Sequence, residues 1–253
     1  MIYIAFIILT VAILFFLFYQ WQYFMVFSPL YYREEPLCAK CSLLSMMTDD
    51  GVELEGALYE PQNPSATLLV FVGRSHDAVA LINRLSQTYP SVRIVTFNYR
   101  SYGKSQGVAN EKNLLEDGIK IAKLVKKNYG DFYLLGFSIG SSVAAYVASK
   151  ITPKALFLIG AFDSIDTLAS LKFGIKIPFL RYHFKTVEFV QDIKSPVALF
   201  VSKDDEITYI ESARKLKTAV KNLNYYKEFE GLQHKDLLWD KQVVEYIKGV
   251  MIC

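Results

Sequence analysis

The stretch that decides the fold runs Phe132-Tyr133-Leu134-Leu135-Gly136-Phe137-Ser138-Ile139-Gly140. An apolar run typical of a buried strand leads into Gly-x-Ser-x-Gly, and a helical pattern follows as far as residue 149. A turn tight enough to join a strand directly to a helix holds its central serine in a strained backbone conformation. The residues two before and two after that serine must be small, and Gly136 and Gly140 are. The pattern therefore predicts that Ser138 projects from the carboxyl end of the strand as a nucleophile.

Outside this stretch, short β-rich segments alternate with longer amphipathic ones. Such alternation indicates a mostly parallel sheet with right-handed crossovers, and the turn Asp49-Asp50-Gly51 indicates an antiparallel hairpin at one edge. We therefore expect an α/β fold of eight strands flanked by helices. The predicted strands are 42–47, 52–59, 68–72, 93–98, 132–137, 155–159, 197–202 and 225–229. The predicted helices are 78–89, 110–128 with Asn110 as N-cap, 139–149, 207–220 and 235–250.

The N-terminal segment is apolar and uncharged over residues 2–19. A helix over this run would be about 27 Å long, close to the thickness of the hydrocarbon core of a bilayer. Trp21, Tyr23 and Phe24 follow it, as in an interfacial aromatic belt. A cleaved signal peptide would need a basic start and small residues at its end, and a buried helix would keep a polar stripe. The sequence therefore predicts an uncleaved, single-pass membrane anchor over residues 1–24.

The remaining chain is long enough for one sizeable domain and short for two. We expect a connector over residues 25–41 and one α/β domain over 42–253. Within that domain, residues 163–195 interrupt the rhythm of strands and helices and predict a small lid. The side of the membrane stays open, because the charges near the anchor offset each other: Arg33 and Lys40 against Glu34 and Glu35.

The net charge and the cysteine count bear on two questions, whether the chain binds nucleic acid and whether its cysteines form disulfides or bind metal. The net charge is +3, with no basic block that would favour a nucleic-acid partner. Three cysteines, Cys38, Cys41 and Cys253, are too few for a disulfide framework. The Cys-x-x-Cys spacing lacks a second ligand pair for zinc and the strand-to-helix setting of a redox motif. Our interpretation is two unremarkable thiols, with a redox or metal site as the alternative.

A serine hydroxyl needs a base to accept its proton, and the chain holds three histidines. Where a serine follows a strand in this way, the chain order is serine, acid, histidine. His76 precedes Ser138, and His183 lies in the predicted lid before any acid at a strand end. His234 follows the last predicted strand and satisfies both order and topology. We therefore expect His234 to be the general base.

The acid and the oxyanion donors are expected at the carboxyl ends of other strands. Two adjacent carboxylates, Asp204 and Asp205, follow the strand 197–202, and spacing alone does not separate them. Gly73, after the strand 68–72, permits a close backbone approach. The backbone N–H groups of Arg74 and Ile139 are therefore the expected oxyanion donors.

Four segments taken together resemble the Bem46-like α/β-hydrolases. Residues 98–107 resemble the family's DYRGYGxSxG signature, 160–165 its SPFTSI segment, 193–197 its IKCPVL segment and 201–207 its HGxxDEIV segment. The resemblance covers roughly residues 45–250 and aligns Asp205, rather than Asp204, with the family's catalytic aspartate. It implies the α/β-hydrolase fold and hydrolysis of an ester, thioester or amide by Ser138, Asp205 and His234, with no metal or cofactor.

Two positions depart from the family pattern. The family commonly has His-Gly-Asn-Ala-Gly at the oxyanion loop, where this chain has Val72-Gly73-Arg74-Ser75-His76. Because the donor there is a backbone group, the hole is compatible with the change, while the shape and charge of the loop differ. The family commonly has a second glycine directly after the Gly-x-Ser-x-Gly motif. This chain has Ser141 there, which affects the packing of the following helix.

The favoured hypothesis is a membrane-anchored serine hydrolase acting on a lipidic small molecule or an acylated protein. Its lid combines apolar side chains with basic ones that can meet anionic head groups. These are Phe173, Ile177, Phe179, Leu180 and Phe184, with Lys172, Lys176 and Arg181. The alternative is a catalytically weak or inactive membrane-tethered scaffold, which the altered oxyanion loop favours. A peptidase is a third hypothesis, and no large extra domain supports it.

Overall fold

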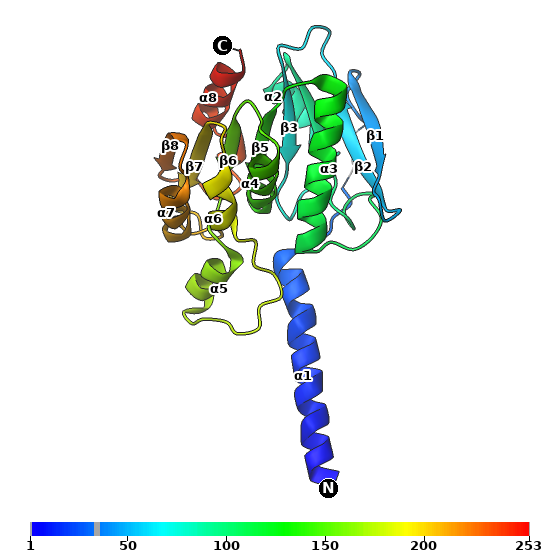
Figure 1. Ribbon diagram of the computed structural model, residues 1–253, viewed down its shortest axis with the longest axis vertical. Helices are drawn as coiled ribbons and strands as arrows, with labels where there is room; N and C mark the ends of the chain where they lie inside the picture. The colour runs from blue at the N-terminus through cyan, green and yellow to red at the C-terminus, as the bar shows by residue number, and fades with distance from the viewer. Residues whose placement is uncertain (1, 33–35, 253) are drawn as a thin grey trace.

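The computed structural model describes residues 2–32 and 36–252 and contains one eight-stranded sheet (Figure 1). The strand order is β1-β2-β4-β3-β5-β6-β7-β8. The pairs β1–β2 and β2–β4 are antiparallel and the other pairs are parallel. The predicted eight strands and edge hairpin are therefore confirmed. The strands are β1 (Cys41–Met47), β2 (Glu53–Tyr59), β3 (Ala66–Phe71), β4 (Val92–Phe97), β5 (Tyr133–Phe137), β6 (Leu156–Ile159), β7 (Val197–Ser202) and β8 (Leu223–Phe229).

Helices cover the sheet on both faces. The central strands β5, β6 and β7 are therefore buried along their whole length. Helices α3 and α4 pack on each other, and Lys248 of α8 lies over the ring of Tyr89, the residue after α2. The helices and 3-10 turns are α1 (Ile2–Val26), α2 (Ile82–Thr88), α3 (Glu111–Tyr129), α4 (Ile139–Lys150), α5 (Ile165–Phe173), α6 (Thr186–Phe189), η1 (Val190–Asp192), α7 (Ile210–Ala219), η2 (Leu237–Trp239) and α8 (Lys241–Ile252).

Helix α2 begins four residues later than the predicted helix 78–89. The carboxylate of Asp77 accepts hydrogen bonds from the backbone N–H groups of Val79, at 3.0 Å, and Ala80, at 3.2 Å. A side chain that binds the following backbone in this way stabilises a turn in competition with the helix. The regular helix therefore starts only at Ile82.

The two C-terminal helices also differ from their predicted ranges, 207–220 and 235–250. Helix α7 starts at Ile210 because the N–H groups before it bind the Asp205 carboxylate instead of a helical carbonyl. The predicted last helix is divided at Asp240 into η2 and α8. The Asp240 carboxylate accepts from the N–H of Gln242 at 2.9 Å, which starts a new helix there.

Helix α1 projects from the domain as a long rod, with the N-terminus at its far end (Figure 1). It is long and apolar enough to cross a membrane, and none of its most apolar window is buried. It extends two residues beyond the predicted boundary at residue 24, and Val26 and Phe27 are buried against the domain. Arg33, Glu34 and Glu35, which with Lys40 leave the side of the membrane open, lie outside the described residues, as does Cys253.

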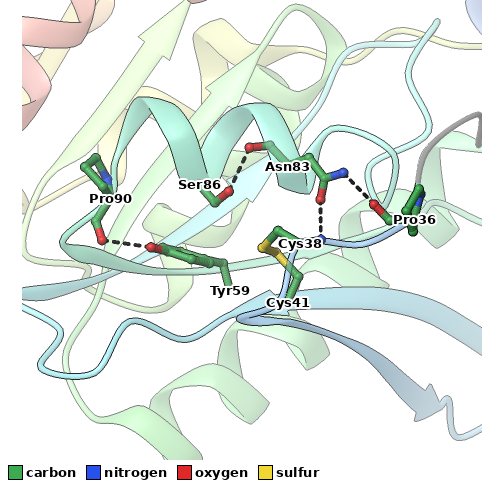
Figure 2. Close-up of a disulfide and its surroundings, with 7 residues drawn as sticks. All are labelled: Pro36, Cys38, Cys41, Tyr59, Asn83, Ser86 and Pro90. Carbon is green, nitrogen blue, oxygen red and sulfur yellow. Dashed lines mark hydrogen bonds between the residues drawn. A yellow bond between two sulfur atoms is a disulfide. The ribbon is translucent and has the colours of Figure 1, made fainter.

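Cys38 and Cys41 form a disulfide, so the interpretation as two free thiols is wrong (Figure 2). The backbone between them turns back on itself, since the N–H of Cys41 donates to the carbonyl of Cys38 at 2.8 Å. That turn brings the two Cα atoms to 5.0 Å, which suits a disulfide. Asn83 of α2 holds the same turn, accepting from the N–H of Cys38 and donating to the carbonyl of Pro36.

Candidate active site

Ser138 lies in the tight turn between β5 and α4. Its φ is +56° and its ψ −124°, a backbone conformation that residues other than glycine rarely adopt. A Cβ atom on Gly136 would lie 2.4 Å from the carbonyl oxygen of Gly140, and one on Gly140 would lie 2.2 Å from that of Phe71. The two glycines therefore meet the steric requirement expected from the sequence.

The structure brings His234 and Asp205 together after β8 and β7. Nδ1 of His234 lies 2.6 Å from Oδ2 of Asp205, and both side chains are buried. Burial alone would raise the pKa of the Asp205 carboxyl. The hydrogen bonds from His234 and Thr208 outweigh that effect and hold this pKa below its usual range. Asp205 is thus kept ionised where it can orient the imidazole.

Asp204 contacts a different group, although it is the sequence neighbour of Asp205. Its Oδ2 accepts a hydrogen bond of 2.6 Å from the backbone N–H of Gly231, in the loop that carries His234. Geometry therefore separates the two carboxylates that spacing left open. Asp205 contacts the histidine, and Asp204 ties down the loop before it.

The His234 ring lies beside the Ser138 turn. Its centroid is 4.9 Å from that of Phe137, the residue before the serine. A Cβ atom on Gly160 would lie 2.9 Å from Cε1 of His234, so the end of β6 also bounds the ring. Ser138 Oγ and the imidazole do not hydrogen-bond to each other within the described ranges. Such bonds are often long before substrate binds.

The predicted oxyanion donors Arg74 and Ile139 line the same pocket as Ser138. Gly73 lies close to Phe137, whose ring a Cβ atom at Gly73 would approach to 3.1 Å. Among the residues with coordinates, neither backbone N–H donates a hydrogen bond. The Arg74 side chain reaches α1, where its guanidinium donates to the carbonyl of Met25 in the wall of the same pocket.

The pocket has a volume of about 200 Å³ and is largely apolar. Arg74 and the turn of Ser138 form one part of its wall. The segment between β6 and β7, predicted as a lid, forms another part and carries the unpredicted helix α5. The end of α1 forms a third part, with Trp21, Met25 and Val26. Sequence spacing gave no sign of this third wall, because residues 21–26 and 168–182 are distant in the chain.

The remaining histidines lie outside the Asp205–His234 pair. His76 is half-buried and lies edge-on against Phe137, and desolvation lowers the pKa of its imidazole. His183 contacts Asp166 of α5 at 2.9 Å and is half-exposed. Across residues 2–32 and 36–252, no group of three or more His, Cys, Asp or Glu side chains is placed to hold a metal ion.

The chain has the α/β-hydrolase fold. The esterase Pf2001 of Pyrococcus furiosus superposes with a TM-score of 0.71 over 88% of this chain and 98% of its own, at 16% identity. An acetyl xylan esterase of Paenibacillus sp. R4 gives a TM-score of 0.71 at 14% identity, over 88% of this chain and 87% of its own. No family model matches the sequence.

Among curated proteins, the chain is similar to lysophosphatidylserine lipases named ABHD12. The Macaca fascicularis protein is 24% identical over 54% of this chain and 40% of its own length. The Danio rerio protein is 26% identical over 53% and 42%. This chain thus spans about two fifths of these lipases. A Mycobacterium tuberculosis protein of unassigned function, Rv2307c, is 25% identical over 75% of this chain and 70% of its own.

Proposed function

We propose that this protein is a serine hydrolase that cleaves an acyl ester, thioester or amide with Ser138 as nucleophile. One observation carries the proposal. A strained serine at the end of β5 opens into an apolar pocket, beside a buried histidine that holds a carboxylate at 2.6 Å. The order serine, acid, histidine along the chain agrees with it.

The proposed reaction has two steps. His234 takes the hydroxyl proton of Ser138 as Oγ forms a bond to the acyl carbon, and it then gives that proton to the leaving group. Asp205 holds the imidazole in the correct tautomer and stabilises its protonated form. In the second step His234 deprotonates a water that attacks the acyl carbon, and it gives that proton to Oγ of Ser138 as the acyl–Oγ bond breaks and the acid leaves.

The oxyanion that forms in each step needs hydrogen-bond donors already in place. The N–H of Ile139 is at the first turn of α4, where helical N–H groups have no partner within the helix and the dipole favours negative charge. The N–H of Arg74 likewise donates no hydrogen bond to any group of the described residues. Both observations favour a working enzyme over an inactive scaffold, even though the loop differs from the family pattern.

The substrate we propose is lipidic or acylated, and the chain is anchored to a membrane by α1. The pocket is lined mainly by apolar side chains, several of them from α1 itself. The similarity to lysophosphatidylserine lipases supports an acyl lipid. The exposed, uncharged helix of 25 residues supports a membrane-spanning anchor over residues 1–24, followed by a connector over 25–41 and the hydrolase domain over 42–253.

We place the chain among the Bem46-like hydrolases, on the four segments that resemble that family. The structure gives its signature segment a role in folding. Arg100 of that segment is buried and pairs with Asp117 of α3 and with Asp50 in the β1–β2 turn. The signature thus joins three elements, rather than contributing side chains to the pocket.

The test is turnover of a short-chain p-nitrophenyl ester by the full-length protein in detergent. Ser138→Ala is expected to remove the activity. Ser142→Ala is the matched control, because Ser142 is a buried serine in α4 whose hydroxyl makes no hydrogen bond in the described structure. Ser142→Ala should retain activity. Equal activity of Ser138→Ala and wild type would refute the proposed nucleophile.

A further inference from the structure

The segment after α5 returns to the domain along the side of α1 (Figure 1). The Phe179 ring meets the Phe15 ring of α1 edge-on, with centroids 6.1 Å apart. The Trp21 ring lies 6.0 Å from that of Phe173. Two separate aromatic contacts therefore place residues 173–179 alongside the last three turns of the apolar helix.

Gln22 fixes this arrangement by binding the backbone of the segment. Its side chain is 4% exposed, although it lies on a predominantly apolar helix. Nε2 donates to the carbonyl of Phe179 at 3.2 Å, and Oε1 accepts from the N–H of Arg181 at 2.7 Å. Non-helical backbone is tolerated at membrane depth where protein groups satisfy its polar atoms, and Gln22 satisfies two of them.

The contact with Phe15 sets the depth of Phe179. Phe15 precedes Trp21 by six residues, which is about 9 Å along a helix axis. Trp21 belongs to the aromatic belt expected at the surface of the hydrocarbon, so Phe15 lies well inside it. The apolar side chains of the segment are nonetheless exposed, at 75% for Phe179 and 65% for Ile175. Exposed apolar groups at this level need an apolar solvent.

We propose that residues 173–180 insert beside α1 into the hydrocarbon of the leaflet that faces the domain, close to its head groups. Acyl chains would then enter the pocket laterally from that leaflet. The pocket supports lateral entry, because Met25 of α1 and Ile177 of the segment are both in its wall together with Ser138. A membrane-resident acyl lipid would then reach Ser138 without crossing water.

The charges around this seam agree with a position at the head groups. Lys172 and Arg74 line the pocket, Lys176 is exposed within residues 173–180, and Glu206 is the acidic residue of the lining. Arg181 lies 4.1 Å over the Tyr19 ring. Long basic side chains next to inserted apolar residues can extend to the lipid phosphates. Lys172 and Arg181 thus flank the inserted segment in the chain, and Lys176 within it has a side chain long enough to extend to the head groups.

The insertion is tested with a fluorescent probe. Phe179→Cys in a Cys253→Ser background is labelled with an environment-sensitive dye and reconstituted into phosphatidylcholine vesicles. Emission should shift to the blue and be quenched by shallow spin-labelled lipids, not by aqueous iodide. The matched control is Val108→Cys, at an exposed apolar position of the domain. Equal quenching by iodide of the dye at position 179 and the dye at position 108 would overturn the proposal.

Lateral entry rests on the proposed hydrolase function, and a second measurement separates the two. Phe179 does not belong to the pocket lining. Phe179→Asp should keep turnover of a soluble p-nitrophenyl ester and lose at least about tenfold on a vesicle-embedded acyl lipid, because a carboxylate resists insertion. Equal losses on both substrates, or none, would contradict lateral entry. Full activity of Ser138→Ala would instead refute the hydrolase function, leaving the probe result to decide insertion.

Discussion

Asp204 and Asp205 are neighbours in the chain, and their carboxylates contact different groups. The sequence narrowed the acid to this pair and needed a resemblance to choose between them. The reason is physical, since a shift of one residue after a strand end turns the side chain to another face. The fold resolves the choice, because β8 places His234 within reach of Asp205 alone of the two.

Asp205→Asn is expected to lower kcat by about ten-thousand-fold, because an amide favours the wrong tautomer of the imidazole. Asp204→Asn leaves that pair intact, and its effect on kcat should stay within about tenfold. Steady-state kinetics of the two variants measure the difference. Similar losses in both variants would contradict the assignment of Asp205.

The lowered pKa of Asp205 also predicts an acid dependence of stability. The native carboxyl stays ionised below its ordinary pKa of 3.8. Its contribution to folding is therefore complete above that value and is lost as the pH falls through the lower, native pKa. Between about pH 5 and about pH 2, the free energy of unfolding should therefore fall less in Asp205→Asn than in wild type. Urea unfolding at several pH values checks this, and an unchanged acid slope would count against it.

The elements of the sheet follow from the sequence more closely than the helix starts do. The turn at Ser138 was predictable because its Gly-x-Ser-x-Gly motif is local in sequence. Gly136 is required by a contact with Gly140, four residues away, whereas Gly140 is required by a contact with the carbonyl of Phe71 in β3. The starts of α2, α7 and α8 were missed by contrast, since aspartate carboxylates take N–H groups that a helical pattern assigns to the helix. Helix α5 was missed too, and it buries none of its residues.

Arg100→Met is expected to lower the free energy of unfolding by about 3–5 kcal/mol, because it leaves the buried Asp117 without its partner. Arg214→Met is the control. Arg214 pairs with Glu228 at the surface, with its own side chain 52% exposed, and the expected cost is about 0–1 kcal/mol. Chemical denaturation in a fixed detergent compares them. A loss below that of the control would contradict the structural role of Arg100.

The disulfide closes a very short loop, since its cysteines are three positions apart. In the chain-entropy model a loop of this size contributes about 2 kcal/mol. Cys38→Ser with Cys41→Ser should therefore lower the free energy of unfolding by about that amount, measured without reductant. The same denaturation experiment with reductant should bring wild type to the level of the variant. Equal free energies of unfolding for wild type and the double variant without reductant would argue against a stabilising bond.

For the molecule as a whole, the sequence predicted an anchor and a domain separately, and the structure adds that they share a pocket. This could not be read from the chain, because Gln22 binds residues 157 and 159 positions away. Contacts at such separations leave no local pattern. The sequence predicted an apolar lid and an apolar anchor as two separate features. The contact between them is seen only in the fold.

An uncleaved anchor makes a distinct prediction for the intact protein. The mature chain should keep residues 1–24 and stay in the membrane fraction at alkaline pH, because its span is uncharged and long enough for the hydrocarbon core. Intact-mass measurement of the extracted protein tests this. A mass lacking the N-terminal segment would identify a cleaved signal sequence instead.

The central claim is that Ser138 is the nucleophile, and adduct mapping tests it most directly. The full-length protein in detergent is treated with a fluorophosphonate, and the modified residue is located by peptide mass spectrometry. The account predicts one adduct, on Ser138, formed in wild type and in Ser142→Ala and absent from Asp205→Asn on the same time scale. An unmodified wild-type protein, or an adduct on another serine, would contradict it.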